Sequence, residues 1–219
     1  MDIVGIRGSQ RGQSINRRLL NLAGECLPAE ASLEVCHWDA VPPFNADVMA
    51  QGLPAPVLAL RERIRQADAV VIATPEYNFS IPGMLKNAID WISRGDDQPL
   101  LHKPVAILSA APGPLGGARV QYDLRKVLLF MNAAVLVKPE VFVGFAPQKF
   151  DDQGQCTDAT TRGFVQAQMT ALMLHIRRQQ QLQTLNGAGR RRARKNDAVP
   201  TLQPAPGLGS RPGCAAPQK

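Results

Sequence analysis

The chain has 219 residues, of which 45% are hydrophobic and 20% charged, a composition typical of a globular domain rather than of a fibrous or disordered chain. The four cysteines show no CxxC or Cys/His spacing, which argues against a zinc site or a disulfide framework and predicts free thiols. The formal charge of +7 does not indicate a basic core. Seven basic residues and one acid follow Arg178, so the first 178 residues carry a net charge of only +1.

Short apolar runs alternate with longer amphipathic segments along these 178 residues. The expected strands are residues 3–6, 33–36, 69–73 and 104–108, with a fifth strand region at 135–137 and 141–144. The first expected helix begins near residue 15, and four more span 55–66, 83–93, 118–131 and 157–175. Thr157 or Asp158 is the expected N-cap of the last. This alternation predicts an α/β fold, namely a flavodoxin-like three-layer sandwich around a parallel five-stranded sheet of order 2-1-3-4-5.

We expect residues 1–178 to form one domain and residues 179–219 to form a basic tail rich in Gln, Gly, Pro and Arg. The tail shows no apolar periodicity, so we predict it to be disordered. Residues 190–195 include five basic residues in six, which could contact a polyanion such as nucleic acid. A solvated tail without nucleic-acid contact is the simpler interpretation.

No apolar run approaches the roughly 18 residues that a membrane span needs. Residues 2–6 begin a strand at once and lack the basic-then-apolar pattern of a signal peptide. We therefore expect a cytoplasmic protein with no membrane contact.

Ligands of open α/β sheets bind beyond the carboxyl ends of the strands, where the strand order reverses. The loops after strands 1, 3 and 4 should meet at that point, and they are the loops with unusual chemistry in this sequence. The first joins strand 1 to the N-terminus of a helix, which favours an anion because its backbone N–H groups lack partners. It contains neutral and cationic donors at Ser9, Arg11, Ser14 and Asn16. Taken alone, it also fits a flexible polar turn, and it is neither a Walker loop nor a GxGxxG loop.

The second loop, residues 74–83, follows the most apolar strand and contains two prolines. Its stiff backbone could face the polar edge of a flat heterocycle, while Tyr77 and Phe79 could stack on the ring or touch its edge. A proline-shaped turn whose aromatics cover the core is an equally good interpretation of this loop alone. The third loop, residues 109–117, consists mostly of small residues that would let a ligand plane approach the backbone closely.

Three segments resemble the NADPH-dependent FMN reductase family: IRGSQRxxSxN at 6–16, PEYNxSIPGxLKNAIDW at 75–91 and PGxLGGAR at 112–119. With QYxLR at 121–125 and KPE at 138–140, the chain is most similar to the bacterial chromate and quinone reductase branch. The resemblance covers about residues 2–178. It departs at Arg7, a position that is usually small in the family, so we expect altered flavin affinity or loop geometry there.

The resemblance implies an FMN-binding oxidoreductase that takes electrons from NADPH or NADH and passes them to quinone, flavin, chromate or another oxyanion, or azo and nitro compounds. It implies a homodimer or homotetramer with the flavin near a subunit interface. The implied FMN phosphate ligands are Ser9, Arg11, Ser14, Ile15 and Asn16. The implied isoalloxazine contacts are Pro75, Glu76, Tyr77, Asn78 and Phe79, with Ser109 and Gly113 along the other side of the ring.

Flavin chemistry requires no side-chain acid or base, so we expect no catalytic side chain, no metal and ping-pong kinetics. The three histidines lie outside the three loops and are interpreted as structural. Glu76 is interpreted as a helix cap or loop-stiffening residue. The alternative is a flavodoxin-type electron carrier of the same fold, although such carriers tend to be acidic and this core is near neutral.

Overall fold

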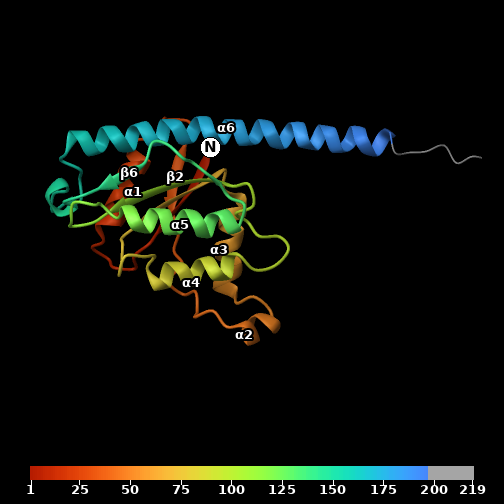
Figure 1. The fold of residues 1–219 in the computed structure, drawn as a ribbon, viewed down its shortest axis with the longest axis horizontal. Helices are drawn as coiled ribbons and strands as arrows, with labels where there is room; N and C mark the ends of the chain where they lie inside the picture. The colour runs from red at the N-terminus through yellow and green to blue at the C-terminus, as the bar shows by residue number, and fades with distance from the viewer. Residues whose placement is uncertain (197–219) are drawn as a thin grey trace, which may run out of the picture. The chain divides into compact units, whose positions relative to one another are not determined.

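The computed structural model describes the backbone of residues 1–196 and the side chains of residues 1–185. Its centre is a parallel sheet of order β2-β1-β3-β4-β5, with a further short strand, β6, that also pairs with β4 (Figure 1). The strands are β1 Asp2–Arg7, β2 Ser32–Val35, β3 Ala69–Thr74, β4 Pro104–Ala110, β5 Ala134–Val135 and β6 Val141–Val143. The predicted flavodoxin-like sheet is confirmed.

The fifth position of the sheet is divided between two strands. Strand β5 pairs with Pro104 and Val105 of β4, and β6 pairs with residues 108–110 farther along the same strand. Pro139 lies between them and has no N–H to donate to a strand ladder, which is a physical reason for the interruption.

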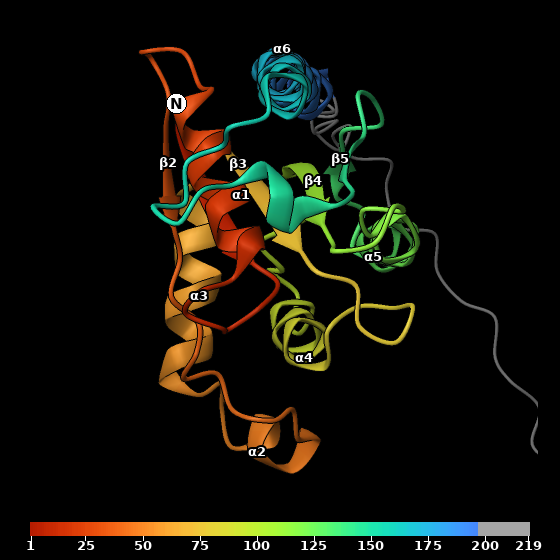
Figure 2. The same cartoon turned by 90° about the vertical axis from the view of Figure 1, so that its left-hand side faces the viewer.

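Helices cover both faces of the sheet (Figure 2). The helices α3 Ala55–Gln66, α4 Gly83–Ile92 and α5 Ala118–Phe130 pack on one face, and α1 Ile15–Glu25 and the first part of α6 Ala159–Asn196 pack on the other. Strand β3 is buried along its whole length because its side chains alternate between the two cores, with Val70 and Ile72 in one and Val71 in the other. In residues 1–196, no helix has both the length and the apolar character needed to cross a membrane.

Helix α6 is longer than expected. Asp158 accepts the N–H of Thr161 at 2.8 Å, as an N-cap should, but the helix continues to Asn196 rather than ending near residue 175. The predicted helix end near residue 175 is therefore wrong, and residues 197–219 of the predicted tail lie outside the described part. Gln, Leu, Ala and Arg form helices even without a buried face, which apolar periodicity cannot detect. The same reason explains why the five-residue helix α2 Ala46–Ala50, which buries no residue, was not expected.

Helix α4 holds the connection that follows β2. The carbonyl of Pro42 accepts hydrogen bonds from the Asn87 amide and the Trp91 indole, both at 2.8 Å. Asn87 also accepts the N–H of Phe44 at 2.7 Å, and the Phe44 ring packs edge-on against Trp91. These two residues of the motif at 75–91 therefore have a structural role.

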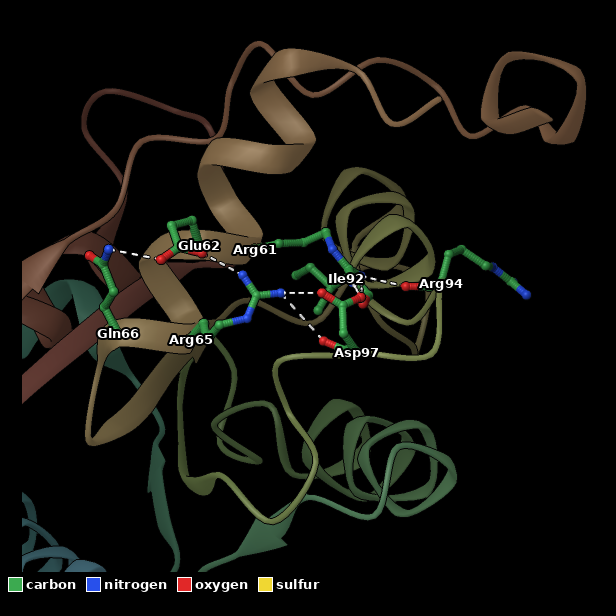
Figure 3. A network of polar contacts seen from close by, with 7 residues as sticks. All are labelled: Arg61, Glu62, Arg65, Gln66, Ile92, Arg94 and Asp97. Atoms are coloured by element: carbon green, nitrogen blue, oxygen red, sulfur yellow. Dashed lines mark hydrogen bonds and ion pairs between the residues drawn. The ribbon is translucent and has the colours of Figure 1, made fainter. Parts of the chain in front are cut away.

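A buried arginine binds the carbonyl groups at the C-terminal end of α4 (Figure 3). Arg61 of α3 is 2% exposed, and its guanidinium donates to the carbonyls of Ile92 and Arg94 and to the carboxylate of Asp97, each at 2.6 Å. A cation at this position satisfies the carbonyl groups that a helix C-terminus leaves without partners. Arg65, one turn farther along α3, donates to the same carboxylate at 2.6 Å.

We expect Arg61→Met to lower the free energy of unfolding by about 3 kcal/mol, because it leaves buried carbonyl groups without donors. Arg65→Met is the matched control: Arg65 shares Asp97 but its side chain is 41% exposed, so its loss should be below about 1 kcal/mol. Urea unfolding of both variants measures the difference. Equal losses would contradict a special role for the buried cation.

Candidate active site

The loops after β1 and β3 lie in direct contact at the carboxyl edge of the sheet. The N–H of Gly8 donates to the carbonyl of Ala73 at 2.7 Å. A Cβ on Gly8 would lie 2.2 Å from the Oγ1 of Thr74 and 2.7 Å from its Cα, closer than any side chain could approach. Glycine is therefore required where the first loop leaves the sheet.

Two polar contacts then join the first loop to the other two. The hydroxyls of Ser9 and Tyr77 lie 3.4 Å apart. The Asn16 amide donates to the carbonyl of Ala110 at 3.0 Å and accepts its N–H at 2.9 Å. Asn16 thus joins α1 to the end of β4, and its backbone N–H and one amide hydrogen are left for the predicted phosphate contact.

The N-terminus of α1 offers the donors that an anion requires. Its N-cap, Ser14, makes no side-chain capping bond within the described residues, and its first turn contains no acid. The N–H groups of Ile15 and Asn16 lack helical acceptors by their position. Arg11 lies exposed on the loop. This end of the helix suits a phosphate group.

Arg7 does not contribute to that site directly. It is 6% exposed and forms an ion pair with Asp39, in the connection after β2. The Asp39 carboxylate therefore balances the charge of Arg7. The residue that departs from the family pattern thus faces Asp39 rather than the first loop.

The second loop is attached to the N-terminus of α5 through Glu76. The N-cap of this helix is Gly117, which has no side chain to accept the first N–H groups. The Glu76 carboxylate accepts the N–H groups of Arg119 and Val120 at 3.1 and 3.2 Å and the Nε of Arg119 at 2.6 Å. The interpretation of Glu76 as a helix cap is confirmed.

The tip of the second loop is a strained turn. Tyr77 and Ser80 exchange two backbone hydrogen bonds, and the residues between them, Asn78 and Phe79, have φ of 50° and 66°. A left-handed conformation costs a bulky residue about 1–2 kcal/mol. The Arg119 guanidinium lies 3.7 Å from the centroid of the Phe79 ring, a cation–π contact that offsets part of this cost. The ring is nevertheless 67% exposed.

Ser80 ties the same loop to α5 a second time. Its hydroxyl donates to Asp123 at 2.9 Å. Hydrogen bonds from Lys126 and from Ser80 lower the pKa of Asp123, so this acceptor is a carboxylate at neutral pH.

A cavity of about 450 Å³ lies between the second and third loops. One wall is formed by polar and aromatic side chains, and the other by the backbone of small residues. The lining residues are Glu76, Asn78, Phe79, Ala111, Gly113, Pro114, Leu115, Gly116, Gly117 and Arg119. Four expected ring contacts, namely Glu76, Asn78, Phe79 and Gly113, therefore meet at one cavity. Pro75 and Tyr77 do not line it.

Ser109 is fully buried, and its hydroxyl donates to the carbonyl of Gly116 at 2.6 Å, so this side chain supports the third loop. Arg119, the last residue of the motif at 112–119, was not predicted as a site residue. The sequence signal for it is a basic residue in the first turn of a helix, where acids are favoured.

A larger cavity, of about 490 Å³, lies between the end of α1 and α6. It contains none of the expected site residues. Its charged groups pair with one another, Arg162 with Glu25 at 3.1 Å and Arg177 with Glu30 at 3.5 Å. We therefore assign the active site to the smaller cavity, which lies at the carboxyl edge.

A parallel 2-1-3-4-5 sheet with an uncapped helix N-terminus after β1 and a cavity between the loops after β3 and β4 is typical of a flavodoxin-like flavoprotein. The model of the NADPH-dependent FMN reductase family matches residues 1–148, and the chain belongs to this family of NAD(P)H oxidoreductases.

Individual relatives agree. The chain is 46% identical over 176 residues to an NAD(P)H-dependent FMN reductase of Pseudomonas aeruginosa, covering 80% of this chain and 95% of the relative. It is 45% identical over 181 residues to a quinone reductase of Escherichia coli, covering 81% and 96%. The solved structure of FerB, a flavoenzyme NAD(P)H:(acceptor) oxidoreductase from Paracoccus denitrificans, superposes with a TM-score of 0.75 at 32% identity, covering 81% and 98%.

We expect Gly8→Ala to lower the free energy of unfolding by about 3 kcal/mol and to reduce FMN retention, because its methyl group overlaps Thr74. Gly12→Ala, in the same loop, is the control: a Cβ there meets no heavy atom of the described chain within 4 Å. Its effect should stay within about 0.5 kcal/mol. Thermal unfolding and the flavin-to-protein absorbance ratio of the purified variants provide the comparison, and equal behaviour would refute the close approach.

Proposed function

We propose that this protein takes hydride from NADPH or NADH and delivers it, through FMN bound at the carboxyl edge, to small acceptors: quinones, flavins, oxyanions such as chromate, or azo and nitro compounds. The observation that carries the proposal is the cavity between the second and third loops, linked to the N-terminus of α1 by the Ser9–Tyr77 and Asn16–Ala110 contacts. The similarity to a quinone reductase of Escherichia coli supports the acceptor class.

The residues present fit FMN. Ser9, Arg11 and Ser14, with the N–H groups of Ile15 and Asn16, would hold the phosphate. Asn78 and Phe79 would border the ring on one side, and the Gly113 backbone would border it on the other, where a Cβ would meet open space within the described chain. When bound, FMN supplies the redox chemistry by accepting a hydride and passing it to the acceptor.

The side chains around the cavity bind and position rather than exchange protons. Among the described residues that line it, only Glu76 and Arg119 are ionisable, and they are paired with each other. The Glu76 carboxylate is already occupied by the N-terminus of α5. A site without a free acid or base fits a reaction in which donor and acceptor use one open face in turn, which supports ping-pong kinetics.

We expect the FMN-loaded protein to oxidise NADPH or NADH with quinone, chromate, azo or nitro acceptors and to give parallel double-reciprocal plots. A stopped-flow mixture with NAD(P)H alone should bleach the flavin before any acceptor is added. Converging plots would contradict the alternating use of one face. Reduction by dithionite but not by NAD(P)H would instead indicate the flavodoxin-type carrier.

We also propose a homodimer or homotetramer. Large apolar side chains remain exposed on α5 and on the neighbouring loops: Tyr77, Phe79, Leu115, Tyr122, Leu129, Phe130 and Val137. Exposed apolar groups that follow one helix and its flanking loops are typical of an interaction surface. A second copy that covered them would also restrict access of water to the cavity.

The double variant Leu129→Ser/Phe130→Ser should shift the protein toward the monomer, because these side chains are 76% and 81% exposed in the single chain. Phe164→Ser is the control, since Phe164 is 58% exposed but lies on α6. Light scattering coupled to size-exclusion chromatography measures the masses. A monomeric wild-type protein would refute the oligomer.

We propose a cytoplasmic location. Cys26, Cys36 and Cys156 are free thiols, and no disulfide joins the cysteines of the described region. Free thiols are typical of reducing compartments.

A further inference from the structure

Two buried glutamines clamp β4 to the segment around β6, one from each face of the sheet. Gln121 of α5 is 0% exposed and Gln168 of α6 is 1% exposed. The Nε2 of Gln168 donates to the carbonyls of Ile107 at 3.1 Å and Pro139 at 2.8 Å. The Oε1 atoms of both glutamines have no hydrogen-bond partner within the described chain. The two residues are therefore closely matched in burial and in bonding.

Gln121 differs from Gln168 in one bond. Its Nε2 donates to the carbonyl of Val141 at 2.8 Å and, also at 2.8 Å, to the hydroxyl oxygen of Ser109. Because an amide N–H can only donate, the single proton of Ser109 is left for another acceptor. That acceptor is the carbonyl of Gly116, at 2.6 Å. The order Gln121, Ser109, Gly116 is thus a hydrogen-bond relay with one fixed direction.

The end of this relay belongs to the active-site cavity. Gly116 lines it, has φ of 58°, and packs so closely on β6 that a Cβ would lie 2.7 Å from the carbonyl carbon of Phe142. At the other end of the third loop, the carbonyl of Gly113 accepts the N–H of Phe145 at 3.2 Å. The Gly116 end is therefore oriented by a side-chain relay, while the Gly113 end is oriented by backbone.

We propose that Gln121 is a positioning residue for the flavin: through Ser109 it orients the Gly116 carbonyl and so fixes the backbone wall against which the ring rests. The inference depends on the proposed binding of FMN in this cavity. Without the amide donor, the Ser109 hydroxyl is free to rotate toward other acceptors, and Gly116 loses its fixed donor. Gln168 donates only to the backbone carbonyls of Ile107 and Pro139, neither of which belongs to the third loop, so it lacks this function.

Gln121→Met removes the donor at nearly constant volume, and it should weaken FMN binding about tenfold, as the loss of one fixed hydrogen bond predicts. Gln168→Met removes an equally buried amide that bonds to the same strand, β4, from helix α6. It should leave FMN affinity unchanged while lowering the unfolding temperature to a similar extent. Affinity is measured by quenching of FMN fluorescence on titration with apoprotein. Equal weakening in both variants, or none in Gln121→Met, would overturn the inference. Failure of the wild-type protein to bind FMN would instead refute the proposed function.

A double-mutant cycle tests the relay itself. If Gln121 acts through Ser109, the double variant Gln121→Met/Ser109→Ala should bind FMN about as weakly as either single variant, roughly tenfold below wild type rather than a hundredfold. Additive losses would show that Gln121 acts by another route. If Gln121→Met does not fold, Ser109→Ala alone must weaken FMN binding, and wild-type affinity in that variant would overturn the inference.

The variant Gln121→Glu adds a readout that packing alone would not change. A carboxyl group can donate to Ser109 only when it is protonated, and burial raises the pKa of a carboxyl group. We expect its FMN affinity to recover as the pH falls, relative to wild type at the same pH, and Gln168→Glu to show no such recovery. A pH-independent deficit in Gln121→Glu would contradict a donor role.

Discussion

The backbone of the first loop passes Thr74 so closely that Gly8 has no room for a side chain. This contact keeps the ends of β1 and β3 together beyond the last ladder bond, and it places Ser9 within reach of Tyr77. The Asn16 amide then fixes the start of α1 against the end of β4, so the first loop is held at both of its ends. The proposed flavin site depends on this close approach, because a wider gap would separate the first loop from the second.

Several backbone groups at helix and strand ends have no local hydrogen-bond partner, and side chains from other segments supply one. Helix α5 begins at a glycine, and Glu76 from the second loop supplies its cap. Helix α4 ends at carbonyls that Arg61 from α3 satisfies. The Asn16 amide joins α1 to β4. Each of these bonds crosses between elements, so both edges of the sheet are held by contacts between segments distant in the sequence.

The difference between local and non-local bonds explains what the sequence could predict. Uninterrupted apolar runs such as residues 69–73 identify a central strand, and the strand order and the three site loops follow from them. Asn16 was expected at the ligand as a polar donor of the first loop, and Ser109 through the family resemblance. Their side chains also bond partners 94 and 7 positions away, which local sequence could not show. The extension of α6 was missed because exposed residues carry no apolar period.

Phe79 and Gly116, which line the cavity, both have left-handed backbone conformations. The described lining residues include no free acid or base. Strain of this kind persists only where surrounding contacts enforce it, and Arg119 does so at Phe79 while itself being held by Glu76. The same carboxylate therefore caps a helix, orients a cation and supports an exposed aromatic ring. Among the described lining residues the only ionisable pair, Glu76 and Arg119, is already engaged, so we propose that the shape of the walls and contact with Phe79 select the acceptor.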